Sequence, residues 1–136
     1  MKKSGYFLLI IGFSLTLVAC VSGAPQGDIK PESNVVLNVN PEELNEMLST
    51  KDFIMVNVHI PFEGDIPGTD LFIPYNQISQ YLDELPNDKK SKIVVYCRSG
   101  SMSDIAAKEL ISFGFTNIIN LEGGFNAWVA AGFPFE

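Results

Sequence analysis

The chain has 136 residues, of which 46% are hydrophobic, and 16 acidic against 9 basic residues give a formal net charge of −7. This length suits a single domain, and the acidic balance argues against binding to nucleic acids or to anionic membranes. The chain has one histidine and two cysteines. Because these lack the number and spacing of metal ligands, we expect no metal and no other cofactor.

The first twenty residues have the pattern of an export signal. Met1-Lys2-Lys3 forms a short basic start, residues 5–19 are almost wholly apolar, and small residues precede Cys20. The apolar stretch is shorter than the roughly 20 residues that span a membrane. The pattern resembles a bacterial lipoprotein signal peptide, which implies a signal over residues 1–19, a lipidated Cys20 and an extracytoplasmic domain anchored to the cell membrane by lipid. An uncleaved anchor or a buried core helix is the alternative.

Residues 20–34 predict a flexible tether, because they contain Ser, Gly, Pro and Gln without hydrophobic periodicity. The domain is expected over residues 35–136. The elements expected in its first half are a strand at 35–39, a helix opening at Pro41 and reaching Leu48, a strand at 53–58, a short strand at 71–73 within a Pro- and Gly-rich stretch, and a helix over 78–85.

The second half of the domain continues the alternation. We expect a strand at 93–96, a helix over about 103–113 that ends at Gly114, a strand at 118–121 and a helix over 125–131. The residues expected on one side of the first of these helices are Met102, Ile105, Ala106, Leu110 and Phe113. Apolar strands that alternate with helices predict an α/β domain with a mainly parallel central sheet flanked by helices, in which ligands gather at the carboxyl ends of the strands.

Cys97 stands at such an end, between the strand at 93–96 and the next helix. There a thiol meets unpaired backbone N–H groups and the positive end of a helix dipole, which together lower a thiol pKa. If Cys20 is lipidated, no second thiol remains for an internal disulfide. We therefore predict that Cys97 is a nucleophile, with an inert buried thiol as the alternative.

Two motifs carry a family resemblance. Residues 97–103 are Cys-Arg-Ser-Gly-Ser-Met-Ser, and Leu-Glu-Gly-Gly-Phe-Asn-Ala-Trp at 121–128 is followed by Ala-Gly-Phe-Pro at 131–134. From residue 35 onward the chain resembles a single-domain rhodanese of the sulfurtransferase family. The resemblance implies a persulfide on Cys97, a sulfane sulfur donor and a thiol or cyanide acceptor. It implies a substrate-binding loop formed by Arg98, Ser99, Gly100, Ser101, Met102 and Ser103. The glycine pair and Trp128 are expected to be structural.

The length of the loop separates two chemistries. Phosphatases and arsenate reductases of related architecture place an arginine at the sixth position after the cysteine, because a tetrahedral oxyanion needs a wide cradle and a guanidinium clamp. The sixth residue after Cys97 is Ser103. The loop therefore resembles the shorter rhodanese type, sized for one sulfur on the cysteine.

The chain also departs from the family pattern. Met102 stands where members that use thiosulfate commonly carry a basic residue, and Asn57, His59 and Asp65 replace an aspartate, an arginine and a histidine. The resemblance makes Asn57, His59 and Glu63 candidate supports of the active loop, in an altered bonding network. We expect polysulfide or a protein persulfide to be a better donor than thiosulfate.

Two classes of function stay open. The first is an extracytoplasmic sulfurtransferase or sulfur carrier, and the second is a catalytically silent rhodanese-like module that binds a partner protein or a small anion. His59 is the one histidine and would be the base if Cys97 performed acyl transfer, but its place in the family pattern favours a structural role. The physiological donor, the acceptor and any protein partner are not specified by the sequence.

Overall fold

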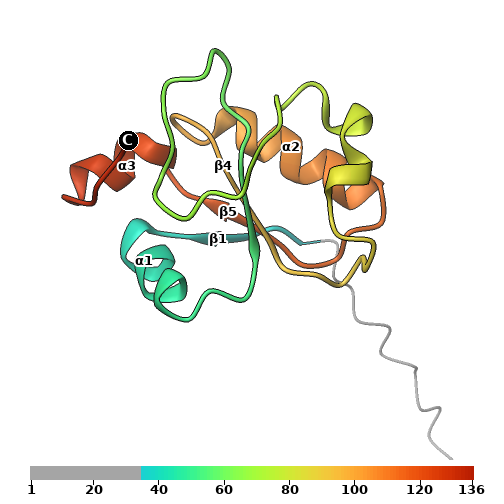
Figure 1. Cartoon of the computed structure of the whole chain (residues 1–136), viewed down its shortest axis with the longest axis horizontal. Coiled ribbons are helices and arrows are strands. Elements are labelled where there is room, and N and C mark those ends of the chain that lie inside the picture. The colour runs from blue at the N-terminus through green and yellow to red at the C-terminus, as the bar shows by residue number, and fades with distance from the viewer. Residues whose placement is uncertain (1–34) are drawn as a thin grey trace, which may run out of the picture. The chain divides into compact units, whose positions relative to one another are not determined.

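A computed structural model of the protein describes residues 35–136 (Figure 1). The expected signal peptide at 1–19, the lipidation site Cys20 and the tether at 20–34 lie outside the described residues. In the described part of the chain, no helix is both long and apolar enough to cross a membrane.

Five strands alternate with helices and short turns. The elements in chain order are β1 (Leu37–Val39), α1 (Pro41–Ser49), β2 (Ile54–Asn57), β3 (Leu71–Phe72), the 3-10 turns η1 (Ile78–Gln80) and η2 (Leu82–Glu84), β4 (Ile93–Tyr96), α2 (Ser101–Ser112), β5 (Ile118–Leu121) and α3 (Gly124–Ala130). All the strand pairs are parallel, in the order β1-β5-β4-β2-β3. The predicted α/β class with a parallel sheet is confirmed.

The sheet separates two hydrophobic cores, and its central strand β4 is buried at all four of its positions. Ile93 and Val95 of β4 face the core formed with α2 and the 3-10 turns. Val94 and Tyr96 face the core formed with α1 and α3. Figure 1 shows α2 and α1 on opposite sides of the sheet. Successive side chains of a strand point to opposite faces, so a strand covered on both faces favours a continuous run of apolar residues.

The helix expected over residues 78–85 is wrong in type, because the segment forms two 3-10 turns. The backbone N–H groups of Tyr81 and Leu85 donate to the carbonyls of Ile78 and Leu82, at 3.1 and 3.2 Å. Ile78 and Leu85 nevertheless reach the core, at 1% and 5% exposure. Eight residues make too short a run to favour an α-helix without tertiary support.

Helix α2 begins two residues earlier than the spacing of apolar residues predicted. Gly100 lies just before the helix with a φ of +104°, and its carbonyl accepts the first helical hydrogen bond from the N–H of Asp104, at 3.0 Å. Ala106 and Leu110 are buried as expected, but Ile105 is 51% exposed. Residue 105 is rotated by about 100° from residue 106 around the helix, which moves it off the packed face.

The parallel sheet positions the candidate site. β4 lies between β2 and β5 in the middle of the sheet, and the chain leaves it directly into the loop that begins at Cys97. Because all strands are parallel, their carboxyl ends share one edge, which we call the carboxyl edge. The segment between β2 and β3 starts at the same edge, and its residues 59–65 supply the other candidate groups.

Candidate functional site

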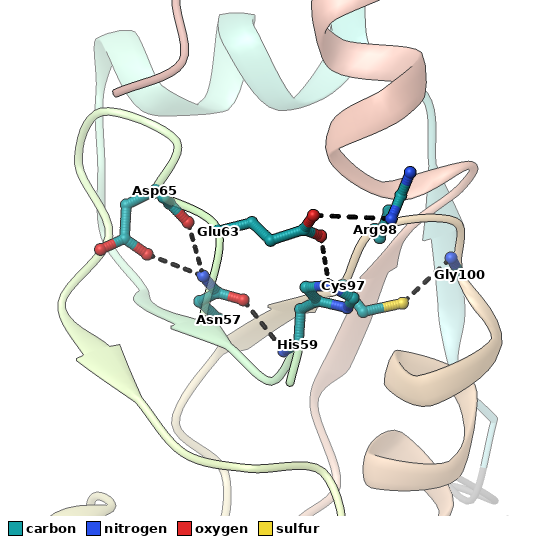
Figure 2. Close-up of polar contacts among 8 residues, drawn as sticks. Asn57, His59, Glu63, Asp65, Cys97, Arg98 and Gly100 are labelled. Atoms are coloured by element: carbon teal, nitrogen blue, oxygen red, sulfur yellow. Dashed lines mark hydrogen bonds and ion pairs between the residues drawn. The ribbon is translucent and has the colours of Figure 1, made fainter. Parts of the chain in front are cut away.

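Cys97 is buried at the carboxyl edge, with 1% of the residue exposed. The backbone N–H of Gly100 donates a hydrogen bond to the Cys97 Sγ at 3.0 Å, and Figure 2 shows the sulfur pointing toward that nitrogen. The hydroxyl of Ser103 donates a second one at 3.5 Å. Ser103 thus places a hydroxyl beside the sulfur, at the position where a phosphatase-type loop has an arginine.

These hydrogen bonds control the ionisation of the thiol. Burial on its own raises the pKa of Cys97, because it penalises the charged form. The hydrogen bonds from the Ser103 hydroxyl and from the backbone of Ser103, Gly100 and Ser99 outweigh burial, so the pKa of Cys97 lies below its ordinary value. The thiolate is the nucleophilic form of cysteine. The loop therefore favours the reactive state of Cys97.

The side chains of the loop differ in exposure. Met102 is half-buried and packs against the core under α2. Ser103 is fully buried. The remaining side-chain-bearing residues of the loop, Arg98, Ser99 and Ser101, are exposed.

Glu63 joins two of the predicted site residues. Its Oε2 lies 2.5 Å from the Nε2 of His59, and its Oε1 lies 3.5 Å from the Nη1 of Arg98 (Figure 2). The His59 side chain is 7% exposed, whereas that of Arg98 is 56% exposed. Because the carboxylate is an acceptor, the Nε2 of His59 carries the proton in this contact. The Nδ1 of His59 is buried and has no hydrogen-bond partner among the described residues.

Asn57 holds the segment that carries these groups. Its amide nitrogen donates to the carbonyl of Gly64 and to the Oδ1 of Asp65, both at 2.9 Å. Its amide oxygen accepts from the backbone N–H of His59 at 3.0 Å. Asn57 and His59 are therefore connected through the backbone of His59, and the imidazole is left to bond Glu63.

Tyr96 links the same segment to β4. Its hydroxyl donates to the Oδ1 of Asp65 and accepts from the backbone N–H of Ile66, both at 3.0 Å. Burial raises the pKa of Tyr96 well above its ordinary value, so the hydroxyl keeps the proton that it donates. Asp65 thus accepts hydrogen bonds from two neutral groups, where the resemblance suggested the place of a histidine.

The motif at residues 121–128 holds the Cys97 loop through backbone hydrogen bonds. The backbone N–H groups of Phe125 and Asn126 donate to the carbonyls of Cys97 and Arg98, at 2.9 and 3.0 Å. Gly124 has a φ of +58°, and a Cβ at this position would lie 2.1 Å from the Cys97 carbonyl oxygen. Only glycine permits this approach of the two backbones.

The last residues of the chain close the same region. Asp65 and Glu136 exchange backbone hydrogen bonds, and the ring of Phe135 stacks on that of Phe125 at 4.6 Å. Phe125 in turn meets the His59 ring edge-on at 5.3 Å. Trp128 is 2% exposed and donates from Nε1 to the Pro134 carbonyl at 2.7 Å, in keeping with its expected structural role.

Sequence reasoning missed several of these contacts. It named Glu63 but not its contacts with His59 and Arg98. A spacing of four residues, as between His59 and Glu63, predicts a side-chain contact only within a helix. It also missed the bond between Tyr96 and Asp65, which lie 31 residues apart. The one available signal was a hydroxyl-bearing residue in an otherwise apolar strand, since a buried tyrosine hydroxyl usually finds a partner.

Two other features lie outside this site. Within residues 35–136, no three His, Cys, Asp or Glu side chains gather where they would hold a metal ion. A hollow of about 440 Å³ lies beside the residues that enter β2 and β4, at the opposite edge of the sheet from Cys97. Its lining includes Lys51, Phe53, Pro86 and Lys92.

Comparison with known proteins gave consistent findings. The family model described as a rhodanese-like domain matches residues 40–131. A sulfurtransferase of Allochromatium vinosum is 35% identical over 104 residues, covering 74% of this chain and 94% of that protein. A thiosulfate sulfurtransferase (GlpE) of Glaesserella parasuis is 26% identical, covering 72% and 91%. A rhodanese-related protein of Thermoplasma volcanium superimposes with a TM-score of 0.63 at 28% identity, covering 74% of this chain and 97% of that one.

Proposed function

Because the chain belongs to the rhodanese-like domain family, we propose that it is a sulfurtransferase or sulfur carrier in which Cys97 receives a sulfane sulfur and passes it on. The observation that carries the proposal is the pair of hydrogen bonds from Gly100 and Ser103 to the Cys97 sulfur. They stabilise negative charge on the nucleophile before the reaction and on the same atom when it becomes a leaving group.

Sulfur transfer proceeds in two displacements. In the first, the Cys97 thiolate attacks the outer sulfur of a donor R–S–SH, a bond forms to Sγ, and the donor's S–S bond breaks as RS⁻ leaves with the electron pair. In the second, an acceptor thiolate or cyanide attacks the outer sulfur, and the electron pair of the Cys97–sulfur bond returns to Sγ. The two steps need no further oxidant or reductant.

The test of this proposal is sulfur release in the variant Cys97→Ser. The natural protein should convert a sulfane donor and cyanide to thiocyanate, and Cys97→Ser should lose this turnover. Ser112→Ala is the control, because Ser112 is exposed at the far end of α2 from Cys97, and it should retain the rate within about twofold. Equal turnover in Cys97→Ser would refute the role of Cys97 in sulfur transfer. No turnover in the natural protein with any donor and acceptor would leave a silent module for a partner protein or a small anion.

We further propose that the domain works outside the cytoplasm, anchored by lipid on Cys20. The support is the basic start, the apolar residues 5–19 and the small residues before Cys20. Cys20→Ala should move the protein from the membrane fraction to the soluble fraction of the cell envelope or the medium. Cys97→Ser retains Cys20 and should stay in the membrane fraction. The lipid anchor is refuted if Cys20→Ala remains membrane-bound.

A further inference from the structure

Positive charge is scarce around Cys97. Among the lysines and arginines of residues 35–136, Arg98 alone lies in the segments that leave the carboxyl edge. Four lysines, Lys51, Lys89, Lys90 and Lys92, lie in the segments that lead into β2 and β4 at the opposite edge. The remaining one, Lys108, is in the second turn of α2 and pairs with Asp104 at 2.5 Å.

Arg98 is itself compensated. Its guanidinium lies 3.5 Å from Glu63, whose other carboxylate oxygen is 2.5 Å from the Nε2 of His59. The buried imidazole thus holds the carboxylate in place beside the loop. A second carboxylate, Asp65, lies on the far side of Asn57 and accepts only from neutral donors within the described residues (Figure 2). The ionised side chains Arg98, Glu63 and Asp65 together therefore carry no net positive charge.

This balance bears on the charge of the donor. Thiosulfate brings two negative charges to the thiolate, so the reacting pair carries three, with sulfite as the leaving group. The form of a hydropersulfide that a thiolate attacks is the protonated one, R–S–SH, which is uncharged at its reacting end, so the reacting pair then carries only the charge of the thiolate. Repulsion between like charges is screened less in a partly buried site than in open water. A fixed carboxylate next to Arg98 therefore penalises thiosulfate more than a hydropersulfide.

We propose that Glu63 is a specificity-determining residue that selects hydropersulfide donors over dianionic thiosulfate. It does so by holding a negative charge beside the loop and by compensating Arg98. This inference rests on the proposed sulfur transfer at Cys97, and it adds the class of donor and the residue that sets it. Glu63 touches neither the sulfur nor the Cys97 side chain in the hydrogen-bond network, so its effect is electrostatic.

The test compares kcat/KM for thiosulfate and for cysteine hydropersulfide, with cyanide as the acceptor. Glu63→Gln should raise the ratio of thiosulfate to hydropersulfide by about tenfold, which corresponds to about 1.4 kcal/mol. Arg98→Gln, which removes an exposed side chain, should lower the ratio. Asp52→Asn is the control, because it removes the same charge from an exposed residue at the entrance to β2, and it should leave the ratio unchanged within about twofold.

The outcomes separate this inference from the proposed function. If neither donor loads Cys97 in the natural protein, sulfur transfer itself is refuted. If both donors load Cys97 but Glu63→Gln leaves the ratio unchanged or lowers it, Glu63 does not set specificity. Equal losses with both donors would make Glu63 only a brace for His59 and would also overturn the inference. A rise in the ratio with Glu63→Gln and a fall with Arg98→Gln would support it.

Discussion

At the scale of single residues, two opposing effects set the pKa of Cys97: burial raises it and hydrogen bonds to the sulfur lower it. Burial opposes the thiolate, and the donors in residues 99–103 favour it. Ser103 is the only one of these residues whose side chain takes part, with its hydroxyl 3.5 Å from the sulfur. The same hydroxyl also lies 3.1 Å from the Gly100 carbonyl oxygen, so a substitution there removes a contact to the sulfur and one to the loop backbone.

Ser103→Ala should raise the pKa of Cys97. The lost hydrogen bond favours the charged form of the thiol, so its removal makes the thiolate harder to form. The thiolate fraction at neutral pH then falls, and alkylation of Cys97 by iodoacetamide should show its inflection at a higher pH than in the natural protein. Ser101→Ala should leave the inflection in place. An unchanged inflection in Ser103→Ala would show that the hydroxyl does not stabilise the thiolate.

The Cys97 loop could be located from the sequence because the residues that identify it are adjacent in the chain. An apolar strand, small polar residues and the start of a helix follow one another directly at Cys97, and the structure brings the backbone N–H of Gly100 to the sulfur. Glu63 and Asp65 each have one partner on a distant segment, which is Arg98 after β4 for Glu63 and Tyr96 in β4 for Asp65. Contacts between distant segments leave no periodic pattern in the chain, so single-sequence reasoning did not find them.

At the scale of elements, the N-terminus of α3 fixes the position of the Cys97 loop. Two backbone N–H groups of α3 bond the carbonyls of Cys97 and Arg98, and the close approach at Gly124 leaves no room for a side chain. The nucleophile therefore depends on an element that begins 27 residues after it. Displacement of α3 should disturb the loop before it disturbs the sheet.

Gly124→Ala should impair both stability and sulfur loading. The new Cβ would lie within 2.6 Å of the Arg98 carbonyl oxygen and closer still to that of Cys97, so the backbone has to move. We expect a loss of more than about 2 kcal/mol in the free energy of unfolding, measured by urea denaturation.

Gly132→Ala is the control for backbone strain alone. Gly132 also has a positive φ, of +88°, but nothing lies within 4 Å of the position of its Cβ. It should cost about 1–2 kcal/mol and leave the loading of Cys97 intact. Equal losses of stability and of loading in the two variants would refute a special role for the contact at Gly124.

The sequence predicted whether a segment is a helix or a strand only where its pattern of apolar residues fits one type of secondary structure. Short runs of mostly apolar residues predicted the strands at 93–96 and 118–121 with their observed bounds. The run at 78–85 has helical spacing, but a pair of 3-10 turns buries the same Ile78 and Leu85. Periodicity over eight residues does not distinguish these structures.

At the scale of the whole molecule, the parallel sheet determines where function is located. It brings the loop after β4, the segment after β2 and the N-terminus of α3 to one edge, while most of the lysines of the described residues lie near the other. The family fold thereby presents its cysteine in a setting without excess positive charge. The proposed sulfur transfer and the proposed choice of donor both rest on this arrangement.

The most direct measurement is the intact mass of the protein after incubation with excess cysteine hydropersulfide, followed by peptide mapping. The account predicts that the natural protein gains one sulfur atom on the peptide that contains Cys97, and that a thiol or cyanide acceptor removes it. Cys97→Ser should show no gain at this peptide. A Cys97 that stays unmodified at saturating hydropersulfide would contradict the account.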